Sequence, residues 1–299
     1  MTDKHKYTKL SLPPKWWRTR STEEIISDSK NCFNEESRLS TGSSVIDRLF
    51  NGGIPKHILF EITGEAGTGK TQWCFSLMAS VLLRNINFSD LNEDINDIGF
   101  VCVIYTENGV FYKERLFEVL YHRIEFEINK KIPDFKHVNA NNDFINIIAR
   151  KLINYVKIYK IDTLKDLELF IQRDIPYICL NYKLDAIFID SITNLYRSKV
   201  SFSDDHSVST GLLQISNVFK KIAFDHDSWF IVTNQTTTDI NNSVLINDSK
   251  GNKKPCLGLL WSNTINWRVF LSKKTHGSER ELSVYLSSEI AKIRYVLTN

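Results

Sequence analysis

The stretch GEAGTGKT, residues 64–71, decides the fold. It matches the pattern Gly-x-x-x-x-Gly-Lys-(Ser/Thr) in full. The apolar run HILFEIT (57–63) precedes it, and the apolar run TQWCFSLMASVLLR (71–84) follows. Glycines let backbone N–H groups converge on phosphate oxygens, and the helix behind such a loop points its positive end at them. The sequence therefore predicts a strand, a phosphate-binding loop and a buried helix; the alternative is a glycine-rich turn without a ligand.

The residues of this loop are candidates for nucleotide contact. Lys70 would bring a full positive charge to the β and γ phosphates, and Thr71 would offer its hydroxyl to Mg²⁺. We therefore expect ATP and Mg²⁺ as cofactors. The loop candidates for nucleotide binding are Gly64, Glu65, Ala66, Gly67, Thr68, Gly69, Lys70 and Thr71.

Outward from the loop, strand-like apolar runs alternate with helical patterns, which predicts a parallel sheet covered by helices on both faces. The last two strand-like runs follow each other without room for a helix, so we expect an antiparallel edge there. The predicted strands after the first are 100–106, 156–161, 184–190, 228–234, 265–273 and 281–288, and the predicted helices after the first are 110–124, 143–156, one from about 163, and 207–226.

Three polar residues follow predicted strands, at the edge where ligands bind in open α/β sheets. Asp190 ends the run LDAIFID and is a candidate to hold Mg²⁺; its alternative role is a cap or turn residue. Glu107 follows FVCVIYT and is a candidate to activate water, because the residue after Asp190 is serine rather than glutamate. Gln235 follows SWFIVTN and could bond the γ-phosphate. Ordinary loop positions are the alternative for Glu107 and Gln235.

The composition narrows the class of protein. The chain has 299 residues, 42% of them hydrophobic and 24% charged, which excludes a wholly disordered chain. Its 12 glycines and six prolines exclude a collagen-like chain, and its net charge of +3 neither demands nor excludes a polyanionic partner. No apolar run reaches the length of about 18 residues that a membrane helix needs. The five cysteines include no CxxC pair and the seven histidines show no metal-ligand spacing. We expect reduced thiols in an intracellular protein.

Two regions are predicted from these patterns. Residues 1–39 are an N-terminal extension that is basic over its first 20 residues, and residues 40–299 form the core. Trp16 and Trp17 in the extension follow a Pro-Pro pair. The extension either becomes ordered on a partner or packs these tryptophans on the core.

Six stretches resemble the RecA superfamily, and specifically the eukaryotic and archaeal RecA/RadA-like recombinases and their accessory paralogs of the X-ray-repair cross-complementing and yeast recombination-mediator type. The resemblance covers about residues 40–299. The stretches are STGSSVIDRLFNGGIP (40–55), GEAGTGKTQ (64–72), YTENGVFYKERL (105–116), LDAIFIDSITNLYR (184–197), VTNQTT (232–237) and KPCLGLLWSNTINWRVFLSK (254–273).

The resemblance implies a RecA-like P-loop ATPase core. It adds Gln72 to the nucleotide-binding candidates, gives Glu107 and Gln235 catalytic roles, and assigns Thr71 and Asp190 to the metal. It implies two DNA-facing loops, at 198–206 and 236–253. The first offers only Lys199 and Phe202 for single-stranded DNA; the second has a lysine cluster, for which a solvated loop is the alternative.

These features favour an accessory paralog over an independent filament-forming recombinase. The extension is shorter than the helical N-terminal domain of full recombinases and contains no convincing Phe-x-x-Ala motif. We expect a nuclear protein of homologous-recombination repair. It would work in a hetero-complex with a recombinase or another paralog, bind single-stranded DNA and hydrolyse ATP weakly. Two alternatives remain: a nucleotide-bound scaffold without required turnover, and a RecA-like motor or helicase.

Overall fold

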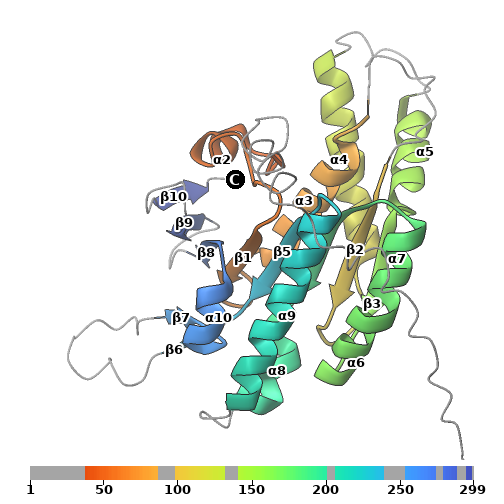
Figure 1. The fold of residues 1–299 in the computed structure, drawn as a ribbon. Coiled ribbons are helices and arrows are strands. Elements are labelled where there is room, and N and C mark those ends of the chain that lie inside the picture. The colour runs from red at the N-terminus through yellow and green to blue at the C-terminus, as the bar shows by residue number, and fades with distance from the viewer. Residues whose placement is uncertain are drawn as a thin grey trace, which may run out of the picture.

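The apolar runs of the sequence come together in one sheet (Figure 1). The computed structural model describes residues 38–86, 98–131, 141–200, 206–238, 253–273, 279–287 and 294–297. Within these ranges the sheet has eight strands in the order β10-β9-β8-β1-β5-β4-β2-β3. They are β1 (Leu59–Gly64), β2 (Phe100–Tyr105), β3 (Val156–Lys160), β4 (Leu184–Asp190), β5 (Trp229–Asn234), β8 (Trp267–Lys273), β9 (Arg280–Leu286) and β10 (Arg294–Leu297).

Most of this sheet is parallel. The neighbouring strands from β8 across to β3 all run in one direction, whereas β9 is antiparallel to β8 and β10 is antiparallel to β9. The predicted α/β class with antiparallel edge strands is confirmed. The pairing of the predicted strand 265–273 differs in one respect, because β8 also pairs parallel with β1. Helix α10 (Gly258–Thr264) precedes β8 and supplies the crossover that a parallel connection needs.

Helices cover both faces of the sheet. Because successive side chains of a strand point to opposite faces, each strand contributes residues to a hydrophobic core on either side. On β1, Phe60 and Ile62 pack in one core and Leu59 packs in the other. The first core includes residues of α2 (Ser44–Leu49), α3 (Lys70–Leu83), α4 (Lys113–Lys131) and α5 (Asn141–Ile153). The second includes residues of α6 (Leu164–Leu169), the π-helical turn η4 (Phe170–Asp174), α7 (Ile175–Asn181), α8 (Ile192–Val200), α9 (His206–Asp225) and α10.

The predicted helix 110–124 is shifted in the structure. Helix α4 begins at Lys113 and continues to Lys131. Phe111 is buried against Phe75 and Tyr105, in edge-to-face contacts that hold this residue outside the helix. A short hairpin of β6 (Thr236–Thr238) and β7 (Lys253–Pro255) lies beside α10 and was not predicted (Figure 1). Among the described helices, none is long and apolar enough to cross a membrane.

Most of the predicted extension lies outside the part of the chain that the structure describes. Its residues 1–37 lie outside the described ranges, as do Trp16 and Trp17. Leu39 is buried and pairs with Ile54 through an isolated β-bridge at the start of the core. The boundary between residues 39 and 40 therefore stays a prediction.

Candidate nucleotide-binding site

The glycine-rich loop connects the buried strand β1 to the start of α3. Gly67 has φ 74° and Gly69 has φ 101°, in the left-handed region where glycine is favoured. A Cβ atom at either position would meet nothing within 4 Å. Backbone conformation, rather than packing, therefore accounts for these two glycines, and the space beside them is open.

Lys70, the first residue of α3, lies over the loop. Its ammonium group donates to the carbonyl oxygens of Gly64 at 2.9 Å and Glu65 at 2.8 Å. Burial lowers the pKa of Lys70, and the charges of Asp190 and Glu107 oppose this shift. The lysine is therefore held beside the loop and close to both acidic candidates.

Asp190 ends the buried strand β4 and faces the start of α3. One carboxylate oxygen, Oδ2, accepts a hydrogen bond from Thr71 Oγ1 at 2.8 Å; the other, Oδ1, accepts one from Thr233 Oγ1 at 2.5 Å. The residue is only 3% exposed. Burial raises the pKa of Asp190, and the two hydroxyl donors partly offset the rise. The two predicted metal-ligating residues, Thr71 and Asp190, are thus in direct contact.

Glu107 follows β2, the strand beside β4. Its Oε1 accepts hydrogen bonds from Ser191 Oγ at 2.8 Å and from Gln235 Nε2 at 3.5 Å, and its Oε2 accepts one from Asn194 Nδ2 at 2.9 Å. The structure thus brings together the two predicted catalytic side chains, Glu107 and Gln235, although their contact is long.

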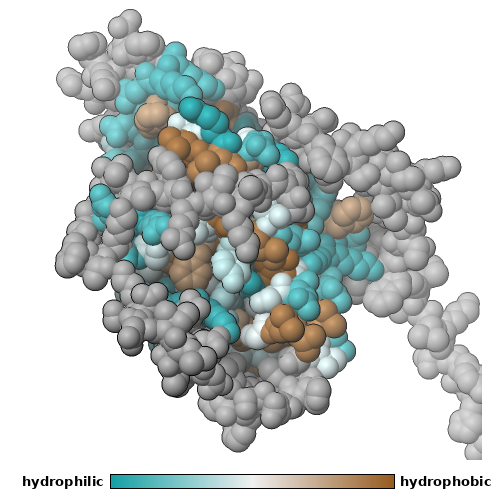
Figure 2. All heavy atoms as spheres, turned by 90° about the vertical axis from the view of Figure 1, so that its left-hand side faces the viewer, coloured by the Kyte–Doolittle hydropathy of each residue, from teal (hydrophilic) through white to brown (hydrophobic). Residues whose placement is uncertain are grey.

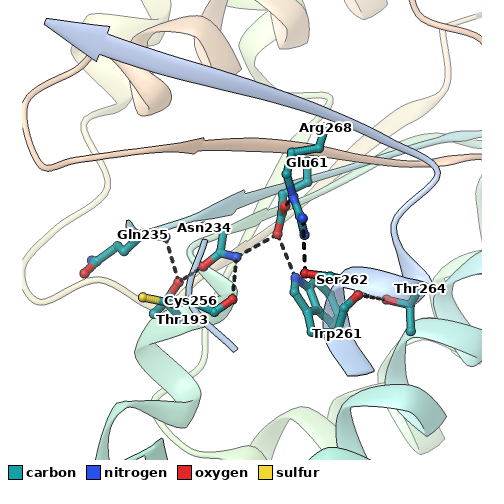
Figure 3. Close-up of polar contacts among 9 residues, drawn as sticks. All are labelled: Glu61, Thr193, Asn234, Gln235, Cys256, Trp261, Ser262, Thr264 and Arg268. Atoms are coloured by element: carbon teal, nitrogen blue, oxygen red, sulfur yellow. Dashed lines mark hydrogen bonds and ion pairs between the residues drawn. The ribbon is translucent and has the colours of Figure 1, made fainter. Parts of the chain in front are cut away.

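Gln235 stands at the end of a buried polar network (Figure 3). Its backbone N–H donates to Thr193 Oγ1 at 2.9 Å, and Thr193 Oγ1 donates to Asn234 Oδ1 at 2.6 Å. From Asn234, a hydrogen bond of 2.7 Å leads to Glu61. Glu61 is fully buried, pairs with Arg268 and accepts a bond from Trp261 Nε1 at 2.7 Å. The network fixes the end of β5 relative to α10 and β8.

The remaining residues predicted to bind nucleotide differ in their exposure and in their hydrogen-bond partners. Thr68 is buried and donates to Glu65 O at 2.9 Å, and Ala66 is exposed. Gln72, a nucleotide-binding candidate by resemblance, accepts a bond of 3.0 Å from Arg115 of α4. Glu65 is half-exposed and pairs with Lys253 of β7 at 2.7 Å. Two of the predicted nucleotide-binding residues, Gln72 and Glu65, thus contact side chains outside the loop.

Several residues that support the site were not predicted. They are Ser191, Thr193, Asn194 and Thr233, together with the buried carboxylate of Glu61. Ser191 directly follows Asp190, and Thr193 and Asn194 lie three and four residues beyond it, so their position close to the acid was a usable signal. Thr233 and Glu61 lie within apolar strand runs, where their partners only become visible in three dimensions.

The donor set fits a magnesium–nucleotide ligand. A hydroxyl and a carboxylate oxygen already in contact are hard oxygen groups, which Mg²⁺ prefers, and Mg²⁺ usually keeps waters and phosphate oxygens in its other positions. No cluster of three or more metal-ligating side chains occurs in the described residues. The open loop with two positive-φ glycines provides room and N–H donors for phosphate.

Most of the two predicted DNA-facing loops lies outside the described ranges. Residues 201–205 and 239–252, including Phe202 and Lys250, lie outside the described ranges. Lys199 belongs to α8, and Lys253 and Lys254 belong to β7, where both are exposed. The predicted DNA contacts therefore stay predictions.

Comparison with known proteins identifies the family of the chain. The Rad51 family model matches residues 34–298. The "DNA repair protein rhp57" of Schizosaccharomyces pombe is 28% identical over 264 residues, covering 79% of this chain and 69% of the relative. The "DNA repair protein XRCC3 homolog" of Arabidopsis thaliana is 26% identical over 249 residues, covering 79% and 76%. The "DNA repair protein RAD51 homolog 3" of Dictyostelium discoideum is 25% identical over 241 residues, covering 79% and 57%. The family model spans most of the sequence, and the chain therefore belongs to the Rad51 family.

Proposed function

We propose that the chain is an ATP-binding recombinase paralog of homologous-recombination DNA repair. It assists the assembly or stability of recombinase filaments on single-stranded DNA, as a nuclear subunit of a hetero-complex with weak DNA-dependent ATPase activity. The observation that carries this proposal is the convergence of the loop, Thr71, Asp190, Glu107 and Gln235 at one edge of the sheet.

Each of these residues has a chemical task in the proposal. When bound, Mg·ATP supplies the phosphoanhydride bond that is hydrolysed. The loop N–H groups and Lys70 bind the phosphates, while Thr71 and Asp190 hold the metal and its waters. Glu107 orients the attacking water and accepts its proton, and Gln235 bonds the γ-phosphate and reports its loss to the hairpin that follows.

Exposed apolar residues on α10 support work in a complex. Leu259 and Leu260, in the first turn of α10, are 76% and 47% exposed. Hydrophobic residues form separate patches among hydrophilic ones on the face that carries α10 and the antiparallel end of the sheet (Figure 2). Exposed apolar residues of this kind are typical of contact surfaces. The relatives named as repair proteins favour a recombinase or another paralog as the partner.

The basic residues near the second predicted DNA loop support nucleic-acid binding. Lys253 and Lys254 form β7, at one end of the segment 239–252. Lysines in such a position neutralise phosphates and make affinity salt-dependent. Single-stranded DNA is therefore the proposed nucleic-acid ligand.

A single set of experiments tests this proposal against the scaffold and the motor. The full chain is tagged in cells, its partners are identified by mass spectrometry, and the complex is assayed for ATP turnover with and without single-stranded DNA. Co-purification of a recombinase or paralog, with slow DNA-stimulated turnover, supports the proposal. If Glu107→Gln abolishes turnover yet leaves repair intact, the scaffold is favoured. Rapid turnover and strand separation by the isolated chain would favour a motor.

A further inference from the structure

Two adjacent residues in the first turn of α8 each hold one of the two catalytic candidates. Asn194 donates from Nδ2 to Glu107 Oε2 at 2.9 Å and to Thr106 O at 3.1 Å. Thr193 Oγ1 accepts from the N–H of Gln235 at 2.9 Å (Figure 3). One turn of helix therefore sets where Glu107 and Gln235 stand relative to each other.

The contacts of Asn194 are long-range and specific. Its two acceptors lie 87 and 88 residues away in the sequence, at the end of the neighbouring strand, so they do not cap its own helix. Both acceptors are oxygens without a proton to donate. The amide nitrogen must therefore face Glu107 and Thr106, and the opposite orientation would place oxygen against oxygen.

The hydrogen bonds on Glu107 fix its orientation without using all of its acceptor capacity. Ser191 bonds Oε1 at 2.8 Å, and Asn194 bonds Oε2 at 2.9 Å. Gln235 Nε2 also bonds Oε1, at 3.5 Å. Since a carboxylate offers about four lone-pair sites, two on each oxygen, Oε2 still has a site for water. A group that must orient water gains from such restraint, because displacing it by about 1 Å can cost about 100-fold in rate.

We propose that Asn194 is a positioning residue: it locks the carboxylate of Glu107 in the orientation that aims water at the nucleotide. Asn194 acts through Glu107 and does not itself touch the nucleotide. The inference rests on the proposed ATPase function and adds the residue on which its rate depends.

The test compares Asn194→Ala with the parent in the full-length chain with its co-purified partner. We expect Asn194→Ala to lower kcat by about 10- to 100-fold, with the Kd for Mg·ATP and KM within about twofold of the parent. Asn194→Gln keeps the amide donor and should retain more turnover than Asn194→Ala. Asn217→Ala, on the exposed side of α9, is the matched control and should behave as the parent.

A double-mutant cycle separates positioning from a general structural role. Glu107→Asp withdraws the carboxylate from Asn194 by one methylene, so adding Asn194→Ala to it should lower kcat by less than about twofold. Parent-like kcat in Asn194→Ala, an equal loss in both backgrounds, or a matching loss of ATP affinity would each overturn the inference. So would a parent that binds ATP without turning it over, which leaves the binding part of the proposed function intact. A parent that binds no ATP refutes the proposed function itself.

Discussion

The buried ion pair between Glu61 and Arg268 should contribute measurably to the free energy of unfolding. The Glu61 side chain is fully buried and that of Arg268 is 3% exposed, and the pair joins β1 to β8. Arg268→Met keeps most of the side-chain volume but removes the cation. The carboxylate of Glu61 is then left in the core without its ionic partner, next to Asn234 and Trp261.

The size of the effect follows from this environment. Removing one partner of a buried ion pair costs about 3–5 kcal/mol. Because Glu61 keeps its hydrogen bonds from Asn234 and Trp261, we expect the lower end, about 3 kcal/mol in the free energy of unfolding. For a domain of this size, where Tm shifts by about 2–4 °C per kcal/mol, the Tm should fall by about 6–12 °C.

Differential scanning calorimetry at one scan rate measures this fall. Arg173→Met, which removes an exposed arginine, is the control and should shift Tm by less than about 2 °C. Combining Arg268→Met with Glu61→Gln removes both charges, so the double variant should lose clearly less than the sum of the single losses. A Tm of Arg268→Met within about 2 °C of the parent, or losses that simply add, would refute the reasoning.

The remaining predictions concern two charged groups outside the core. Burial raises the pKa of Asp227, but hydrogen bonds from His57 and Lys56 outweigh it and lower the pKa to about 2. The stabilisation of the fold by ionised Asp227 is therefore fully present above the unfolded pKa of about 4 and is lost as the pH falls toward 2. The Tm difference between the parent and Asp227→Asn should shrink between pH 7 and pH 2.5; an unchanged difference contradicts the assignment. The pair between Lys253 and Glu65 is half-exposed and should contribute no more than about 1 kcal/mol, so Lys253→Ala should lower Tm by no more than about 4 °C, and a larger fall would contradict this.

Local sequence patterns were sufficient to predict the strands β1 to β5, β8 and β9 and the helices α3, α4, α5, α6 and α9. The apolar runs around Phe60, Ile187 and Ile231 each form a buried central strand, because both faces of a parallel sheet are covered. The helices α2, α8 and α10, the strand β10 and the hairpin β6–β7 were not predicted. Leu257 at the start of α10 adopts a left-handed conformation that a sequence pattern does not disclose for leucine.

The candidate site was predictable where one residue type at a strand end carries the chemistry, as for Asp190 and Glu107. The supporting contacts were not predictable, since they depend on which strands become neighbours. Thr233 reaches Asp190 because β5 lies beside β4, and Asn234 reaches Glu61 because β5 also lies beside β1. The order of strands in the sheet is a property of the whole chain rather than of any local stretch.

Binding of Mg·ATP to the parent, Lys70→Ala and Lys165→Ala, measured by isothermal titration calorimetry, tests the central claim most directly. Lys165, exposed on α6, is the matched control. A charge-assisted contact to phosphate contributes about 1.5–3 kcal/mol, so Lys70→Ala should bind at least about tenfold more weakly than the parent, and Lys165→Ala should bind as the parent does. Equal affinity in Lys70→Ala and the parent, or a parent that binds no nucleotide, would contradict the account.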